Sequence, residues 1–513
     1  MKPIRLMSGF FTVGVWTLLS RVLGFLREVL LLSLIGPGPV MDAFVAAFRL
    51  PNMFRRFFAE GAFNAAFVPM FAKKLEGEEG AGKFARDAFN GLALVVLALT
   101  ALGMIFMPGL VWLTAEGFVG DARFDMTVEF GRIAFPYILC MSLSALFSGI
   151  LNATGRFAVA AAAPVLLNIF VIAAMTFAAL TGGDVALWLI WSIPLAGLAQ
   201  LALTWRAAAQ AGYPLRPSRP RWTPDMRAMI VIALPAALAS GVMQINLVVG
   251  QLVASQYDKA VSWLFAADRL YQLPLGVVGI AVGIVLLPDL SRRLRAGDND
   301  GAQTALSRAA EISLALTIPS AVALMVVPFA LVTVLFQRGA SGVDDTAAIA
   351  TAVMIYGLGL PSFVLQKILQ PVYFAREDTR RPFYFAVVAM VVNAALAVGL
   401  APFIGWIAPA VATTLAGWTM FACLAIGARR FGDAAKFDAR FHKRIWRILM
   451  ASAAMGVALW LGNAALQPML GLPWWRGLAL VLLIAIGAVS YFGIGQLIGA
   501  FRLSEFKRAV RRG

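Results

Sequence analysis

Residues 20–69 read SRVLGFLREVLLLSLIGPGPVMDAFVAAFRLPNMFRRFFAEGAFNAAFVP, and this stretch decides the fold and function that the sequence predicts. It is apolar enough for two membrane-spanning helices, yet charged residues recur through the middle of both. They are Arg21, Arg27, Glu28, Asp42, Arg49, Arg55, Arg56 and Glu60. An arginine that faces lipid at the bilayer centre costs about 2.5–3.5 kcal/mol on insertion scales. Five would cost on the order of 12–17 kcal/mol, more than the stability of most domains. We therefore expect the arginines to face a hydrated interior lined by protein.

The helical period places part of this charge on one face. At about 100° per residue, Asp42, Arg49 and Arg56 share one side of a helix with Glu60, whereas Arg55 points away from Arg56. Two interpretations stay open. The arginines either snorkel toward the span ends and form structural ion pairs, or they line an anion site inside the membrane. Their recurrence across the middle of the spans favours the anion site.

The composition indicates a polytopic helical membrane protein. The chain has 513 residues, of which 61% are hydrophobic and 13% charged, with a mean hydropathy of +0.83. Lys and Arg outnumber Asp and Glu by 43 to 26. No long basic run alternates with aromatic residues, so nucleic acid is not predicted as a partner. The two cysteines, Cys140 and Cys423, each lie in an apolar run and are expected as buried free thiols.

Apolar segments separated by polar loops predict about 14 transmembrane helices and an all-α fold. The predicted spans are 7–35, 41–72, 86–113, 127–153, 158–180, 185–207, 227–256, 261–290, 305–336, 346–374, 382–402, 405–428, 445–466 and 475–500. With an inside amino terminus, 31 Lys and Arg fall in inside loops and termini, 5 in outside loops and 7 within spans. This asymmetry predicts that both termini are cytoplasmic.

An internal repeat divides the predicted spans. FRLP at 48–51 matches DRLY at 268–271, and VPMFAKKL at 68–75 matches LPDLSRRL at 287–294. We therefore expect an N-terminal six-helix lobe at 1–225 and a second six-helix lobe at 226–430. Residues 431–513 add two further transmembrane helices and a basic cytoplasmic tail. Because each half has an even number of spans, the repeats are parallel, an arrangement that transporters use for alternating access around a central site. Residues 212–227, rich in Pro and Arg, are predicted to link the halves along the cytoplasmic surface.

Charged and amide residues also lie inside the predicted spans of the second half. Asp268 and Arg269 are adjacent, and Arg269 matches Arg49 in the repeat. Asp268 either pairs locally with Arg269 or contributes to the site. Lys367 is a further embedded cation without an assigned role. Asn168 and Asn393 occupy equivalent repeat positions, and hydrogen bonds between helices are the default expectation for both.

Motifs for catalysis are weak. GEEGAGKF at 77–84 has the G-x-x-x-x-G-K spacing, but Phe84 stands where a P-loop needs Ser or Thr, and no strand precedes it. His442 is the single histidine, so neither a histidine-based zinc site nor Ser–His or Cys–His catalysis is predicted. No metal, no cofactor and no enzymatic activity are predicted.

Four segments closely resemble the MurJ (MviN) family of lipid II flippases in the MOP exporter superfamily. They are SRVLGFLRE, the stretch at 42–69, AADRLYQLPLGVVGIAVGIVLLPDLS and FPYILCMSLSALFSGILNATGRF. The resemblance covers essentially the whole chain. It implies a bacterial inner-membrane transporter that moves the undecaprenyl-pyrophosphate-linked peptidoglycan precursor from the cytoplasmic to the periplasmic leaflet.

The resemblance also implies functional positions at Arg21, Arg27, Asp42, Arg55, Arg56, Glu60 and Arg269. It further implies that the last two helices leave an apolar groove for the lipid tail. Lipid II, membrane lipids and other cell-wall synthesis proteins are the implied partners, and the coupling ion stays open. An exporter of another lipid-linked oligosaccharide or a multidrug exporter would share the fold. A drug site should instead show acidic and aromatic lining, and a polyprenyl-phosphate enzyme should show an acidic metal pair or a catalytic histidine.

Overall fold

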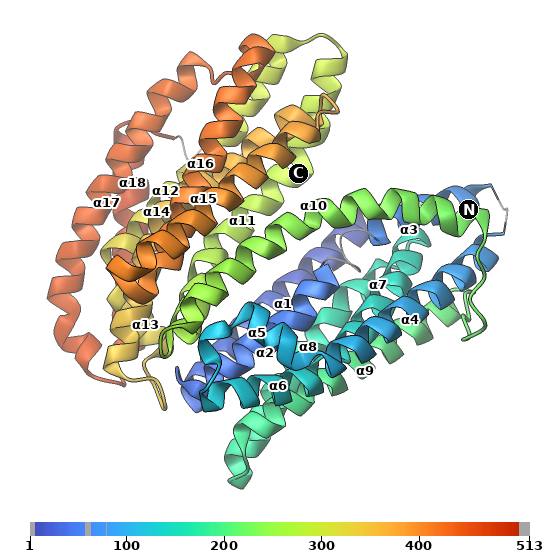
Figure 1. The fold of residues 1–513 in the computed structure, drawn as a ribbon. Coiled ribbons are helices and arrows are strands. Elements are labelled where there is room, and N and C mark those ends of the chain that lie inside the picture. Colours follow the sequence, from blue (N-terminus) through green and yellow to red (C-terminus); the bar gives the residue numbers. More distant parts are fainter. Residues whose placement is uncertain (1–5, 57–62, 78–79, 502–513) are drawn as a thin grey trace. The chain divides into compact units, whose positions relative to one another are not determined.

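The computed structural model describes residues 6–56, 63–77 and 80–501, and every regular element in these ranges is a helix. The predicted all-α fold is thus confirmed. The chain forms two compact units, Met1–Ser262 and Trp263–Gly513, drawn together in Figure 1. The predicted repeat boundary at 225/226 stays a prediction, because a sequence repeat need not end where a packing unit ends.

The first unit contains ten α-helices and the first residues of an eleventh. The helices are α1 (Leu6–Leu34), α2 (Pro39–Arg55), α3 (Asn64–Glu76), α4 (Ala81–Ile105), α5 (Met107–Thr114), α6 (Ala122–Ala134), α7 (Tyr137–Ala153), α8 (Phe157–Thr181), α9 (Val185–Gln210) and α10 (Pro224–Ser255), with a short 3₁₀ helix η2 (Glu116–Phe118). α1 packs on α8, α8 on α9, and α2 on α6. Stacked aromatic rings fill the core: Phe67 lies 5.5 Å from Phe71 and 5.6 Å from Phe84 between ring centroids.

The second unit contains the body of α11 and the remaining helices. They are α11 (Ala260–Arg295), α12 (Asn299–Val326), α13 (Pro328–Phe336), α14 (Val343–Phe374), α15 (Arg380–Ile404), α16 (Ala408–Ala428), α17 (Ala439–Gly471) and α18 (Arg476–Leu497), with 3₁₀ helices η3 (Gly405–Ile407) and η4 (Arg429–Ala435). α15 packs on α16, α14 on α12 and α16, and α17 on both α18 and α12. The two last helices therefore attach to this unit through α12, and they lie side by side in Figure 1.

The helices follow the predicted spans closely. Among the described residues, nine candidate spans are long and apolar enough to cross a membrane. Predicted span 41–72 contains α2 and α3, with residues 57–62 between them outside the described ranges. Three other predicted spans, 86–113, 127–153 and 305–336, are each built from two helices, and a proline stands at each of these breaks. α5 carries Pro at its first positions, α7 follows Pro136, and α13 begins at Pro328. Proline lacks the N–H that continues a helix and clashes with the preceding turn, so the chain breaks at these points.

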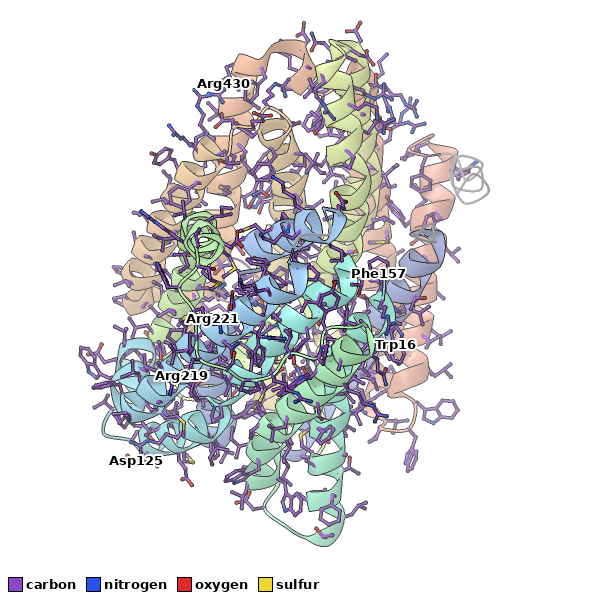
Figure 2. All side chains as sticks on the ribbon, turned by 90° about the vertical axis from the view of Figure 1, so that its right-hand side faces the viewer. Trp16, Asp125, Phe157, Arg219, Arg221 and Arg430 are labelled. Atoms are coloured by element: carbon purple, nitrogen blue, oxygen red, sulfur yellow. The ribbon has the colours of Figure 1, made fainter. Side chains whose placement is uncertain are left out.

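The predicted linker is non-helical over residues 213–223 and is fastened to the first unit. The Trp205 indole N–H donates to the carbonyl oxygen of Leu215 at 3.0 Å. The Asn90 amide donates to Ser218 Oγ at 2.9 Å and accepts from the Ser218 backbone N–H at 2.7 Å. Arg219 and Arg221, labelled in Figure 2, are exposed. The linker is therefore held to the first unit through Leu215 and Ser218, while the side chains of Arg219 and Arg221 are exposed to solvent or lipid headgroups.

Two predictions about embedded polar residues can be judged directly. Asn168 Nδ2 donates to the Ser20 carbonyl oxygen at 3.0 Å, so the predicted bond between helices joins α8 to α1. Both cysteines are free thiols, but only Cys140 is buried; Cys423 is half-buried. Burial of Cys423 was wrong because its α16 position is only partly covered by neighbouring helices.

Candidate functional site

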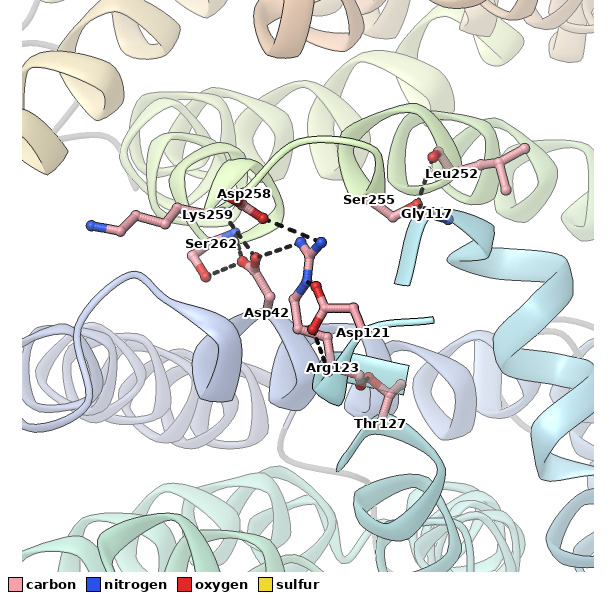
Figure 3. Close-up of polar contacts among 10 residues, drawn as sticks. All are labelled: Asp42, Gly117, Asp121, Arg123, Thr127, Leu252, Ser255, Asp258, Lys259 and Ser262. Carbon is pink, nitrogen blue, oxygen red and sulfur yellow. Dashed lines mark hydrogen bonds and ion pairs between the residues drawn. The ribbon is translucent and has the colours of Figure 1, made fainter. Parts of the chain in front are cut away.

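Asp42 lies in the first turn of α2 and is fully buried. Its carboxylate accepts hydrogen bonds from the backbone N–H groups of Lys259 at 3.1 Å and Ser262 at 2.9 Å. The Ser262 hydroxyl donates to it as well. Figure 3 shows these contacts converging on the start of α11. A carboxylate at a helix N-terminus satisfies amides that have no partner within the helix, and the helix dipole favours its charge.

Arg123, in the first turn of α6, lies close to the Asp42 carboxylate and to two further carboxylates, those of Asp121 and Asp258. Its Nη1 lies 3.6 Å from Asp42 Oδ2, its Nη2 lies 3.3 Å from Asp258 Oδ1, and its Nε donates to Asp121 Oδ2 at 2.6 Å. The guanidinium also stacks on the Phe118 ring at 4.6 Å. Its side chain is only 7% exposed. Sequence reasoning assigned Arg123 to an outside loop and missed it, because its partners come from segments far apart in the chain.

Asp121 is the N-cap of α6 and forms an ion pair with Arg123. Its carboxylate accepts from the Arg123 backbone N–H at 2.9 Å. This backbone hydrogen bond, followed by the Arg123 side chain, lowers the pKa of Asp121 below its ordinary value of 3.8. Asp121 therefore stays ionised at neutral pH and supplies permanent negative charge to Arg123.

The arginines predicted from the opening stretch have different environments in the first unit. Arg49 is half-buried and its Nη1 donates to the Leu247 carbonyl oxygen on α10 at 3.3 Å. Arg27 is half-buried and its Nη2 lies 2.5 Å from Glu28 Oε1. Arg55 is half-buried, whereas Arg21 and Arg56 are exposed. Asp42 and Arg49 thus both contact the α10–α11 segment. Glu60 lies outside the described residues.

The predicted site residues of the second unit lie on α11. Asp268 accepts a hydrogen bond from the Gln272 side chain on the next helical turn. The Arg269 guanidinium stacks on the Phe265 ring at 4.5 Å. Both side chains are half-buried. Lys367, on α14, is exposed.

An apolar groove of about 300 Å³ runs between α12, α13, α17 and α18 in the second unit. Its lining is almost entirely aliphatic and aromatic and comprises Ala315, Leu316, Pro319, Ser320, Ala323, Val327, Leu331, Met455, Leu459, Leu480, Leu483, Ile484, Gly487, Ala488, Tyr491 and Phe492. The Tyr491 hydroxyl donates to the Ala315 carbonyl oxygen at 2.5 Å, and the Ser320 hydroxyl donates to Leu316 at 2.8 Å. The polar groups of the lining are thus satisfied by the protein, and the predicted groove beside the last two helices is present.

Comparison with known proteins identifies the family. The sequence model described as "Lipid II flippase MurJ" matches residues 31–476. The chain belongs to this family. A "Probable lipid II flippase MurJ" of Rhizobium tropici is 42% identical over 523 residues, covering 99% of this chain and 97% of that protein. The protein of the same description from Rhizobium meliloti (strain 1021) is 44% identical over 528 residues, with the same coverage. The predicted resemblance is confirmed.

Solved structures agree with this membership of the MurJ family. The chain matches a structure titled "Lipid II flippase MurJ, inward closed conformation" with a TM-score of 0.80 and 25% identity, covering 94% of this chain and 98% of that one. An inward-facing MATE multidrug transporter of the MOP superfamily matches with a TM-score of 0.67 at 15% identity, covering 82% and 96%. The MATE likeness shows a shared fold only.

Proposed function

We propose that this chain is a transporter, not an enzyme, that flips lipid II from the cytoplasmic to the periplasmic leaflet of the bacterial inner membrane. The observation that carries the proposal is family membership over residues 31–476, joined to relatives that align along nearly their whole length. The multidrug alternative is not favoured, because the MATE structures share the fold at 15% identity or less. Both termini are cytoplasmic in this proposal.

The arginines of α1, α2 and α11 are the proposed grip on the substrate. Lipid II carries a pyrophosphate that cannot cross hydrocarbon unaided, and guanidinium forks bind phosphate oxygens in a bidentate manner. The proposed contacts are Arg21, Arg27, Asp42, Arg49, Arg55, Arg56, Glu60, Asp268 and Arg269. The half-buried settings of Arg27, Arg55 and Arg269 support this role. Such side chains avoid the full desolvation of a buried charge and keep donors within reach of water.

Alternating access is the proposed mechanism of turnover. Parallel repeats at 1–225 and 226–430 would rock about a central site, and a substrate shifts such an equilibrium only by fitting one state better than the other. The groove beside α17 and α18 is proposed to hold the polyprenyl tail while the headgroup occupies the arginine site. Its satisfied polar groups and aliphatic lining suit a hydrocarbon chain. Other cell-wall synthesis proteins are proposed partners.

The decisive experiment separates anion binding from structural support. In a leaflet-accessibility assay for lipid II, Arg27→Ala and Arg269→Ala should abolish translocation while the protein accumulates normally on a membrane blot. Removing one charged, desolvated partner costs about 2–5 kcal/mol, which is ample to lose function. Arg→Lys at either position keeps charge but loses the fork, so it should restore activity partly. Arg132→Ala, an exposed arginine on α6, is the matched control. Full translocation by both alanine variants would contradict the anion site, and matched loss of protein would show a structural role.

The groove has its own test. Ala488→Phe places a bulky side chain in the groove from an exposed lining position, and translocation should fall because the tail loses its space. Ala485→Phe is the control, since Ala485 is exposed on the same helix and does not line the groove. Equal activity of the two variants would show that the groove is not a substrate element.

A further inference from the structure

The charge cluster around Asp42 joins three segments of the first unit that are distant in sequence. Asp42 comes from α2, and Asp121 and Arg123 come from the start of α6. Asp258 and Lys259 come from the α10–α11 turn, and Ser262 comes from the first turn of α11. Figure 3 shows Asp258, Lys259 and Ser262 on one side of Asp42 and Arg123 beside it. Three donors to Asp42 come from the turn and the first turn of α11, while Arg123 belongs to a helix that packs directly on α2. The carboxylate thus has one set of partners that can leave with the turn and one that stays.

The turn itself is held in an unfavourable conformation. Lys259 has a φ of +62°, in the left-handed region that residues with a side chain rarely adopt. Its backbone N–H donates to Asp42 Oδ2 at 3.1 Å. Strained backbone persists only where surrounding contacts impose it. The Asp42 carboxylate is such a contact, so the turn gains backbone freedom when that contact breaks.

Neutral contacts dock the end of α10 beside the cluster. The Gly117 backbone N–H donates to Ser255 Oγ at 3.1 Å, and Gln251 Nε2 donates to the Thr114 carbonyl oxygen at 3.2 Å. A Cβ on Gly117 would lie 2.5 Å from the Ser255 backbone, so only glycine permits this approach. The close approach of Gly117 also includes the backbone of Gln256. Beyond Gln256, the turn is held by the charged cluster.

Arg123 has a spare donor aimed at Asp42. Its Nη1 is buried and makes no hydrogen bond within the described part of the chain. It lies 3.6 Å from Asp42 Oδ2, just beyond hydrogen-bond distance. While the turn is docked, the backbone N–H groups of Lys259 and Ser262 donate to the Asp42 carboxylate, and Arg123 Nη1 makes no hydrogen bond to it. A small approach would let Nη1 take their place.

We propose that Arg123 is a positioning residue of the transport cycle that takes over the Asp42 carboxylate when the α10–α11 turn leaves it. A buried carboxylate stripped of its donors is strongly disfavoured unless a cation replaces them. Arg123 supplies that cation from within α6, so the start of α11 can undock without exposing an uncompensated charge. Asp258 acts in the opposite sense, because its bond to Arg123 exists only while the turn is docked. This inference rests on the proposed transport cycle and adds a residue to it.

The test measures undocking directly. Ala260, fully buried at the start of α11, is changed to Cys in a Cys140→Ala, Cys423→Ala background. Its labelling by a membrane-impermeant maleimide is followed in the intact protein in membranes. Arg123→Gln should lower the labelling rate by at least about threefold. In this variant, undocking leaves the buried Asp42 carboxylate without a cation to replace the lost donors, so the undocked state is less populated. Asp258→Asn should raise it, since the docked state loses a contact. Arg132→Gln should leave it unchanged, and Arg123→Lys should recover part of the rate.

Three results would overturn the inference. If Arg123→Gln raised labelling as Asp258→Asn does, Arg123 would be a simple clamp on the turn. If it also raised labelling of a cysteine placed at buried Ala178 on α8, its role would be general stability. An unchanged rate would likewise reject the exchange. The assay contains no lipid II, so the proposed substrate can fail while the exchange at Asp42 stands, and the reverse.

Discussion

Asp42 in the first unit and Glu311 in the second are both buried carboxylates, but they are held in different ways. Asp42 is fully buried and receives two backbone amides, one hydroxyl and a guanidinium at 3.6 Å. Glu311, 5% exposed on α12, is surrounded by guanidinium groups. Arg308 donates to Oε1, while Arg444 lies 3.2 Å and Arg440 3.8 Å from Oε2.

The difference distinguishes a contact that can be exchanged from one that is permanent. The amides on Asp42 move as a unit with one turn, and Arg123 can replace them. The guanidinium groups on Glu311 come from two long helices, and Arg308 also bonds Asp438, the N-cap of α17. The Asp438 backbone N–H donates to Ser307 Oγ at 2.9 Å. The Glu311 cluster thus fastens α17 to α12, the two helices that form one side of the apolar groove.

The largest effect on stability is expected at Glu311. Glu311→Ala should lower the free energy of unfolding by about 3 kcal/mol, because three guanidinium groups lose their shared anion. Thermal unfolding in detergent, followed by tryptophan fluorescence, measures this. Translocation should fall together with stability, since the groove loses its support. A stable Glu311→Ala variant with normal activity would show that the Glu311 cluster is not needed to hold α17 on α12.

A smaller stability effect and a larger functional one are expected at Asp42. Asp42→Asn should cost about 2 kcal/mol, typical for hydrogen bonds to a charged group, because Arg123 keeps Asp121 and Asp258. Translocation should be lost even at normal abundance. In the Asp42→Asn background, Arg123→Gln should no longer lower Ala260→Cys labelling, since no charge is left to exchange; it should instead raise labelling, as Asp258→Asn does, because the Arg123–Asp258 bond is lost. Additive effects of the two changes would contradict the comparison.

The sequence predicted the helices better than the contacts between them. The predicted spans 158–180 and 185–207 correspond to the helices Phe157–Thr181 and Val185–Gln210. Their boundaries can be predicted because an apolar run long enough to cross the bilayer ends where polar residues begin. The sequence also selected Asp42 and Arg49, since charge inside an apolar span is conspicuous. Arg123 sits in the first turn of α6, where charged residues are ordinary, and Glu311 lies in the charged part of α12 that precedes its apolar part. Their partners in other segments lie 81 or more residues away along the chain, so only the folded chain shows which charges meet.

Within the Glu311 cluster, Arg440 should matter little. It lies 3.8 Å from the carboxylate with its side chain 49% exposed, so water screens the pair. Arg440→Gln should change stability by roughly 0.5 kcal/mol or less, as is typical of exposed ion pairs. Arg444→Gln, at 3.2 Å and 17% exposed, is the comparison variant and should cost more. Thermal midpoints of the two variants decide the order, and an inverted order would mean that α17 is not held through Arg444.

The smallest expected effect is the pH dependence contributed by Asp121. Its folded pKa is lowered below 3.8, first by the Arg123 backbone N–H and then by the Arg123 side chain. A carboxyl with a depressed folded pKa stabilises the fold above its ordinary pKa, and this contribution is lost as pH falls through the folded pKa. The difference in thermal midpoint between the natural chain and Asp121→Asn should therefore shrink as the pH falls through 3.8 and below. Other carboxylates cancel in that difference. Because the backbone N–H is the larger cause, Arg123→Gln should keep most of this pH dependence while it abolishes the exchange at Asp42. Loss of the whole pH dependence in Arg123→Gln would mean that the side chain, not the cap of α6, sets the charge of Asp121.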